Sequence, residues 1–119
     1  GQITAENVTL VPWIDLILKS GYKKFDIAPP QYRRIKNLDG SYLVQFRGSI
    51  KPTSGNFITT QVSVATLSGV YRPPINTVRQ GGDSSGKGAR VFVDPNGNLS
   101  ILAPNNSSYV YIDELSYIN

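Results

Sequence analysis

The sequence predicts an all-β protein: an antiparallel β-sandwich, or a jelly-roll-like arrangement, built as a single domain. Several runs alternate apolar and polar residues with a period of two, and turn-forming residues separate these runs at short intervals. No segment has a convincing helical period with capping residues. The chain of 119 residues has the size of one domain and can bury one core. Roughly eight short strands are expected, as is typical of this class.

The clearest hairpin joins residues 31–36 (QYRRIK) to residues 41–50 (SYLVQFRGSI) through the turn NLDG. In the second strand the apolar residues share one face: Tyr42, Val44, Phe46 and Ile50. The polar residues share the other face: Gln45, Arg47 and Ser49. Such alternation is typical of a strand that buries one face.

Three later segments are also expected to be strands or hairpins. Residues 57–67 place four residues on one face: Ile58, Thr60, Val62 and Val64. In residues 89–103 the turn Asp94-Pro95-Asn96-Gly97 separates two apolar pairs, Val91 with Val93 and Leu99 with Ile101. Residues 108–119 are expected to add one or two strands.

The N-terminal run TLVPWIDLILKSG can be interpreted as a strand or as a short helix with Pro12 at its first position. We expect a strand at the edge of a sheet, because Leu10, Ile14, Leu16 and Leu18 share one parity. Residues 1–12 are then a lead-in or linker, and residues 13–119 form the β-sandwich domain. Since the chain begins with Gly1 and contains no Met, we expect it to be the C-terminal part of a longer protein.

The composition excludes several kinds of chemistry. The chain has no Cys and no His, so disulfides, zinc sites built on these residues and His-activated nucleophiles are excluded. No apolar run reaches the ~18–20 residues that a membrane span needs. The net charge of +4 comes from basic residues spread along the chain, whereas a nucleic-acid surface usually clusters them. We expect no cofactor, no metal, no nucleic-acid partner and no membrane partner.

The loop GGDSSGKG resembles a phosphate-binding loop, because Gly81 precedes Gly86-Lys87 at the required spacing. The last position is Gly88 instead of Ser or Thr, and a strand follows instead of a helix. We therefore expect a surface loop between strands.

Catalytic carboxylates are a second possibility that the sequence disfavours. Asp39, Asp83 and Asp94 fall in expected turns, where Asp commonly caps the backbone. Asp113 and Glu114 are adjacent, so in a strand they would point to opposite faces. Only Asp15 and Asp26 remain as a pair that could converge, and we expect no enzyme activity.

Tyrosine and arginine supply the candidate binding residues. The chain has 7 Tyr and 1 Trp, and several of the tyrosines stand beside cations. Tyr can stack on sugars or fill protein interfaces, and Arg binds phosphate or carboxylate. The candidate saccharide-binding residues are Trp13, Tyr32, Arg33, Tyr71 and Arg72. The alternative for each is a structural role, and four further tyrosines are expected in the core or on sheet faces: Tyr42, Tyr109, Tyr111 and Tyr117.

An ordered set of motifs resembles a C-terminal domain of bacteriophage tail baseplate and tail-fibre proteins, of the kind found in phages of Gram-positive bacteria. The motifs are PWIDLILKSGYK, PPQYRRI, DGSYLVQFRGSI and ATLSGVYRPP. Matched by position, Arg47-Gly48 is the strand ending of the pattern and Tyr71-Arg72-Pro73 is its rim step. The chain departs from the pattern at Ser68, where Pro is commoner, and at Val70, which is inserted.

The resemblance implies a receptor-binding head, usually a homotrimer at the tip of a tail fibre and part of the virion. Its partners would be other phage tail proteins and, on the host surface, a cell-wall polysaccharide or teichoic acid. Two alternatives stay open: a structural or trimerisation module of the baseplate, and a polysaccharide depolymerase. A trimer would also bury Phe57, Ala65 and Leu67, which we expect on the less apolar face of their strand.

Tyr71 and Arg72 are expected at one end of the sandwich, where Pro73 and Pro74 impose an extended backbone. Such a stiff segment would hold both side chains ready for contact with a saccharide or a neighbouring subunit.

Overall fold

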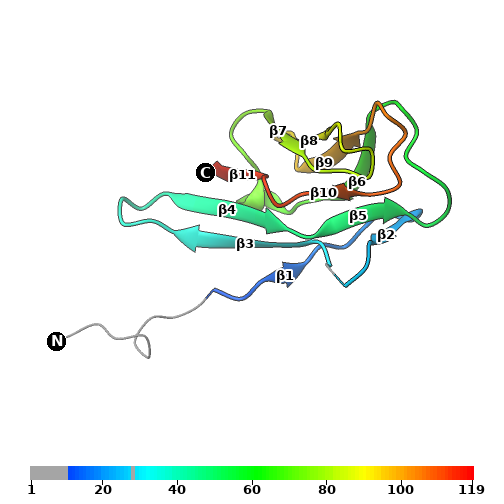
Figure 1. Cartoon of the computed structure of the whole chain (residues 1–119). Helices are drawn as coiled ribbons and strands as arrows, with labels where there is room; N and C mark the ends of the chain where they lie inside the picture. The colour runs from blue at the N-terminus through cyan, green and yellow to red at the C-terminus, as the bar shows by residue number, and fades with distance from the viewer. Residues whose placement is uncertain (1–10, 28) are drawn as a thin grey trace.

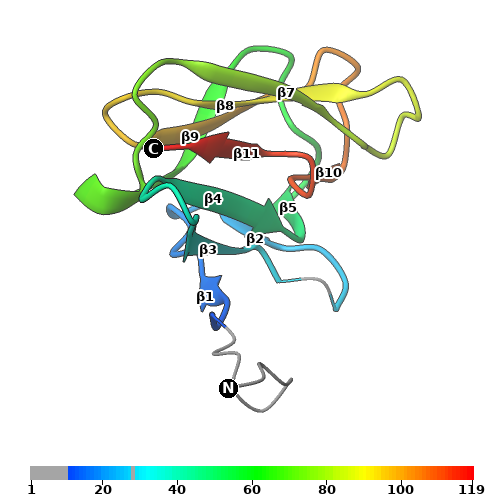
Figure 2. The ribbon, with the colours of Figure 1, turned by 90° about the vertical axis from the view of Figure 1, so that its left-hand side faces the viewer.

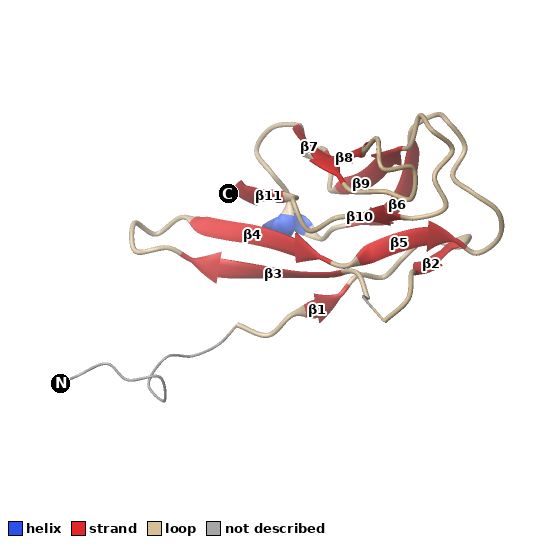
Figure 3. Ribbon diagram, viewed as in Figure 1, coloured by secondary structure: helices blue, strands red, loops and turns tan. Residues whose placement is uncertain are grey.

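Residues 11–27 and 29–119 are described by a computed structural model of the chain, shown in Figure 1. Over these residues the structure is all-β, with one short 3-10 helix, η2 (Gly69–Tyr71), which Figure 3 shows as the single blue segment. The strands are β1 (Ile14–Asp15), β2 (Tyr22–Lys24), β3 (Gln31–Lys36), β4 (Tyr42–Arg47), β5 (Ser49–Pro52), β6 (Val62–Thr66), β7 (Thr77–Gly81), β8 (Ala89–Val93), β9 (Asn98–Leu102), β10 (Val110–Tyr111) and β11 (Ser116–Ile118). The expected all-β class is confirmed, with eleven short strands among the described residues in place of about eight. Within the described ranges no helix is long and apolar enough to cross a membrane.

Two of the three sheets form one long antiparallel surface. The first has the order β1-β3-β4-β11 and the second has the order β10-β5-β2. They are continuous, because β4 runs directly into β5 through Gly48, with β3 and β2 on one side and β11 and β10 on the other. Figure 2 shows β1, β3, β4 and β11 in this order, starting from the N-terminal end.

Gly48 marks the bend between β4 and β5. Its φ of 102° lies in the left-handed region, and a Cβ there would lie 2.1 Å from the carbonyl oxygen of Pro29. The backbone N–H of Gly48 donates to Asp113 Oδ1 at 3.1 Å, and its carbonyl accepts from Ile112 N at 2.9 Å. The segments that join β2 to β3 and β10 to β11 therefore both approach the central strand at this glycine.

The third sheet has the order β6-β9-β8-β7 and covers the buried face of the long surface. Its centre is the predicted hairpin: β8 pairs with β9 across the turn at Asp94–Gly97, and all four predicted apolar residues are buried. Asp94 accepts hydrogen bonds from the backbone N–H groups of Asn96 and Asn98, which is the expected capping role. The core between the sheets also includes Val44, Phe46, Ile50, Val64 and Val110.

The expected strand over residues 57–67 is partly wrong. β6 begins only at Val62, and Ile58 and Thr60 are exposed. The pairing of β6 with β9 shifts between Ser63 and Ala65, so Val64 and Ala65 are both fully buried.

The expected trimer contact at Phe57, Ala65 and Leu67 is also wrong. All three side chains belong to the core of the single chain, with exposures of 2%, 0% and 2%. The bulge in β6 breaks the alternation from which an exposed face was predicted.

The C-terminal segment forms two strands, which agrees with the one or two strands expected there. Asp113 and Glu114 lie in the turn between β10 and β11 instead of in a strand, so the argument from opposite strand faces does not apply to them. Leu10 and the rest of residues 1–10 lie outside the described residues. The edge strand expected from Pro12 is present, but β1 covers only Ile14 and Asp15. The shared parity does not give a shared face, because Leu16 is buried whereas Ile14 is 39% exposed.

Candidate binding surface

The polar face of the long sheet, here called the outer face, lies opposite the buried Val44 and Phe46. The register of β3 and β4 places Arg33 opposite Gln45 and Gln31 opposite Arg47. Side chains alternate between faces along a strand, so these four polar residues share the outer face. β1 adds Asp15 next to Gln31.

Trp13 packs on this face against two arginines. The Cζ atoms of Arg33 and Arg47 each lie 4.2 Å from the centre of its ring. A cation held over an aromatic ring contributes about 0.5–1 kcal/mol at an exposed site. The ring is half-buried, so it presents part of its surface to solvent.

Hydrogen bonds orient both arginines. Arg33 Nε donates to Gln45 Oε1 at 3.0 Å, and Arg47 Nε donates to Gln31 Oε1 at 2.8 Å. Gln31 Nε2 in turn donates to Asp15 Oδ1 at 2.8 Å. In the described part of the chain neither guanidinium has a carboxylate within 4.0 Å. The cluster therefore presents positive charge together with amide and carboxylate oxygens, which suits polar ligands such as saccharides and phosphate groups.

A cleft of about 430 Å³ begins beside this cluster, at the bend of the long sheet. Gly48 lies at the bend between its two walls: Ile27 and Pro29 come from the segment between β2 and β3, and Asp113 comes from the turn between β10 and β11. Arg47, Gln31 and Tyr111 complete the lining. Arg47 thus belongs both to the cleft and to the Trp13 cluster.

The five sequence-predicted site residues fall into two separate groups. Trp13 and Arg33 lie together on the outer face, as described above. Tyr32 has the opposite orientation, because it pairs with buried Phe46 across β3 and β4. Its ring meets the ring of Tyr71 edge-on, with centroids 4.8 Å apart, and both rings pack against the core.

Tyr71 and Arg72 are engaged mainly in internal contacts. Arg72 Nε donates to the carbonyl of Leu67 at 3.0 Å, and Tyr117 Oη donates to the carbonyl of Tyr71. Asn119 Nδ2 donates to the carbonyls of Val70 and Arg72 at 2.8 and 3.1 Å. Burial raises the pKa of Tyr117. Burial also raises the pKa of Tyr32, and the neighbouring Tyr71 makes a smaller contribution in the same direction. The extended backbone expected at Arg72 is present, with φ −81° and ψ 142°.

Sequence reasoning missed Arg47, Gln31 and Gln45 as members of the site. The alternation of residues 41–50 already placed Gln45 and Arg47 on the polar face. The additional signal was the hairpin register, because it brings Arg33 and Gln31 opposite these two residues.

The carboxylates that fell in expected turns cap the backbone. Asp39 accepts from the backbone N–H and the hydroxyl of Ser41, which lowers its pKa. Burial acts to raise the pKa of Asp83, but hydrogen bonds from Ser107, Ser85 and Gly88 outweigh it and lower the pKa. Residues 82–88 form the predicted loop between β7, which ends at Gly81, and β8. The described residues contain no group of three or more acidic side chains that could hold a metal ion.

The fold places the chain in the class of small antiparallel β-sandwich domains. Among solved structures it is similar to the head domain of phage bIL170, whose structure was determined in a comparison of the receptor-binding domains of lactococcal phages. The two chains are 22% identical, and the match covers 90% of this chain and 96% of the other with a TM-score of 0.55. The resemblance to phage head domains is therefore confirmed at the level of the fold. No family model and no curated protein matches the chain.

Proposed function

We propose that this chain is the receptor-binding head of a phage tail baseplate or fibre, which attaches the virion to a saccharide or teichoic acid on the surface of a Gram-positive host. The observation that carries the proposal is the Trp13–Arg33–Arg47 cluster on the outer face of a phage head-domain fold. An aromatic ring can stack on a sugar, while guanidinium and amide groups bind hydroxyl or phosphate oxygens.

The charge of the cluster suits an anionic polymer. Two guanidiniums share one ring, and Asp15, the only carboxylate of this hydrogen-bonded group among the described residues, contacts Gln31 instead of an arginine. A ligand with phosphate or acidic groups would supply the missing counter-charge. Binding at one site is expected to be weak, and several heads on one virion would supply avidity.

Whole-cell binding tests this proposal. Fluorescently labelled chain should bind at least one strain in a panel of Gram-positive bacteria that includes lactococci. Trp13→Ala together with Arg33→Ala should reduce binding at least about tenfold, which corresponds to ~1.4 kcal/mol. Arg90→Ala is the matched control, because Arg90 is exposed on the other sheet and its loss removes the same charge.

Two results would contradict the proposal. The first is the absence of binding to every strain. The second is equal binding by the double variant and the unaltered chain. A shortening of purified wall polymer during incubation would instead favour a depolymerase.

A structural role as a trimerisation module is the second candidate. A groove of about 370 Å³ lies where β7 meets β11, and apolar side chains are exposed along it and beside it. These side chains are Ile75, Val78 and Ile118. We propose that copies of the chain associate as a homotrimer through this region. It lies at the β11 edge of the sheet β1-β3-β4-β11, whereas β1 and Trp13 lie at the other edge. Receptor binding and trimer formation can therefore coexist.

A further inference from the structure

We propose that the outer face carries a second saccharide subsite, formed by Phe25, Tyr109 and Tyr111, and that the cleft at Gly48 joins it to the Trp13 cluster. The ligand is then an extended chain of several sugars that lies across the bend of the long sheet. This inference rests on the proposed receptor-binding function and specifies the length and position of the ligand.

The second subsite is an aromatic cluster outside the core. The rings of Phe25 and Tyr109 are stacked, with centroids 3.9 Å apart and an angle of 4° between their planes. Tyr111 meets Tyr109 edge-on at 5.7 Å. All three are half-buried, and none of them is among the aromatic residues that pack against the core, in contrast to Tyr22, Tyr32 and Tyr71. In the stacked pair each ring covers one face of the other, so a sugar would contact the remaining exposed faces and edges of these rings.

The register of the strands places this cluster on the outer face. Val110 pairs with Ile50, and both are fully buried, so the next pair, Tyr111 and Ser49, points to the opposite side. The Ser49 hydroxyl donates to the carbonyl of Phe25 at 2.9 Å, which brings the Phe25 segment over this face of β5. Tyr111 and Arg47 are thus on the same side of the long sheet.

The cleft lies between the two subsites and shares lining residues with both. Arg47 lines the cleft and also contacts Trp13, while Tyr111 lines the cleft and also contacts Tyr109. Gly48 at the bend presents backbone instead of a side chain. Asp113 is exposed in the cleft wall and uses Oδ1 for the N–H of Gly48, so its second oxygen can accept a hydrogen bond from a sugar hydroxyl.

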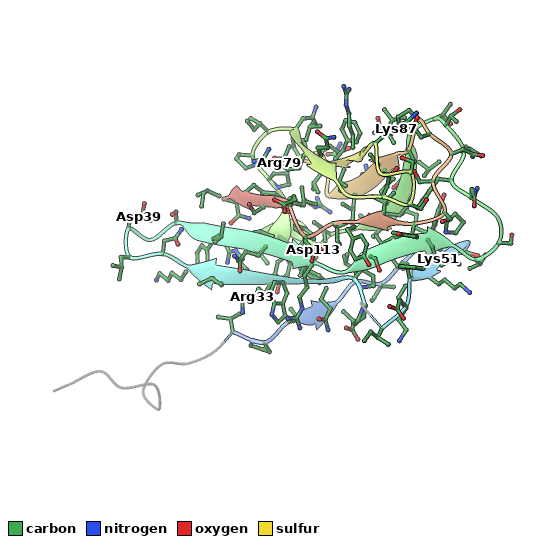
Figure 4. The ribbon with its side chains drawn as sticks, in the orientation of Figure 1. Arg33, Asp39, Lys51, Arg79, Lys87 and Asp113 are labelled. Atoms are coloured by element: carbon green, nitrogen blue, oxygen red, sulfur yellow. The ribbon has the colours of Figure 1, made fainter. Side chains whose placement is uncertain are left out.

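The span of this surface exceeds a single sugar. From Arg47 to Lys51 the central chain can advance at most about 13 Å, at ~3.3 Å per residue, and the bend at Gly48 shortens this span. Lys51 lies with its Nζ atom 6.0 Å from the centre of the Phe25 ring, so each aromatic subsite has a cation beside it. Figure 4 shows Asp113 between Arg33 and Lys51 along the length of the long sheet. The surface therefore fits a chain of several sugars better than a single terminal sugar.

The test uses oligosaccharides of graded length, prepared by partial hydrolysis of wall polysaccharide from the strain that binds the chain best. Calorimetry should give an affinity that rises about tenfold with length and then levels off. Tyr109→Ala and Phe25→Ala should each bind the shortest fragment as the unaltered chain does, while losing most of the gain with length. Trp13→Ala should weaken binding of all lengths, and Arg90→Ala should weaken none.

A crystal structure with the longest fragment tests the inference without any variant. Sugars should occupy the Trp13 cluster, the cleft and the Phe25–Tyr109 stack. Affinity that is independent of length, or sugars only at Trp13, would overturn the second subsite and leave the proposed function intact. Absence of binding by all fragments would overturn both.

Discussion

Phe57 illustrates how the position of one side chain depends on its tertiary neighbours. Its ring is buried against the ring of Tyr22, with centroids 6.0 Å apart, and its backbone N–H donates to the carbonyl of Ser107. Neither partner is near in sequence, and the strand that would have set its parity begins only at Val62. Alternation within residues 57–67 therefore assigned this ring to the wrong environment.

Replacement of this ring should destabilise the single chain. Phe57→Ala should lower the free energy of unfolding by about 3–5 kcal/mol, because it removes a fully buried aromatic side chain and leaves a cavity. The neighbouring Ile58→Ala is the control, since Ile58 is 60% exposed and its loss should change stability by less than about 0.5 kcal/mol. Urea unfolding measures both. A stability change below 1 kcal/mol for Phe57→Ala would contradict the assigned burial.

At the level of the element, the bend between β4 and β5 defines the candidate binding surface. The hairpin of β3 with β4 was predicted, and the predicted bounds of β3 are correct. The strand predicted over residues 41–50 is instead interrupted at Gly48, between β4 and β5. At this position Pro29, which lies in a distant segment, occupies the space that a side chain at position 48 would need. A period of two in the sequence carries no sign of such a contact.

Gly48→Ala should cost more stability than a comparable substitution in a turn. Both Gly48 and Gly40 have positive φ, at 102° and 91°, but nothing lies within 4 Å of a Cβ at Gly40. Gly40→Ala should therefore cost only the backbone strain of about 1–3 kcal/mol. Gly48→Ala adds a clash with Pro29 and should exceed it by about 1 kcal/mol or more in thermal or urea unfolding. Equal losses of stability for the two substitutions would indicate that the Pro29 backbone lies farther from Gly48 than described.

The loop at residues 81–88 should make stability depend on pH. The pKa of Asp83 is lower in the folded chain than its ordinary value near 3.9, so the carboxylate stabilises the fold above about pH 4. This contribution is lost as the pH falls through the lowered value. Urea unfolding between about pH 5 and 2 should show decreasing stability, and Asp83→Asn should make that decrease smaller.

Part of the decrease should remain in Asp83→Asn, because the pKa values of Asp39 and Asp94 are also lowered. Asp26→Asn, which changes an exposed carboxylate outside these turns, is the control and should follow the unaltered chain. An unchanged slope in Asp83→Asn would show that the Ser107 and Gly88 contacts contribute little to folding.

At the level of the whole molecule, the proposed trimer depends on the apolar groove between β7 and β11. Ile75 and Ile118 line this groove and are 71% and 51% exposed in the single chain, and burial of such side chains between subunits would favour association. We expect light scattering to give the mass of three chains at micromolar concentration. Ile118→Asp should shift the chain to monomer while retaining the far-UV circular dichroism of the folded chain, because Ile118 is outside the core. A monomer in the unaltered chain would contradict the proposed trimer.

Local patterns were enough to predict the all-β class, the hairpin of β3 with β4, the turn at Asp94–Gly97 and the capping role of Asp39, Asp83 and Asp94. Each of these depends on residues close together in sequence, where alternation and turn chemistry act directly. The meeting of Trp13 with Arg47, and of Phe25 with Tyr109, depends instead on strand register and on connecting segments that cross at Gly48. Those contacts arise only when the core brings distant strands together, so the candidate binding surface could be recognised in the folded molecule and not in the order of its residues.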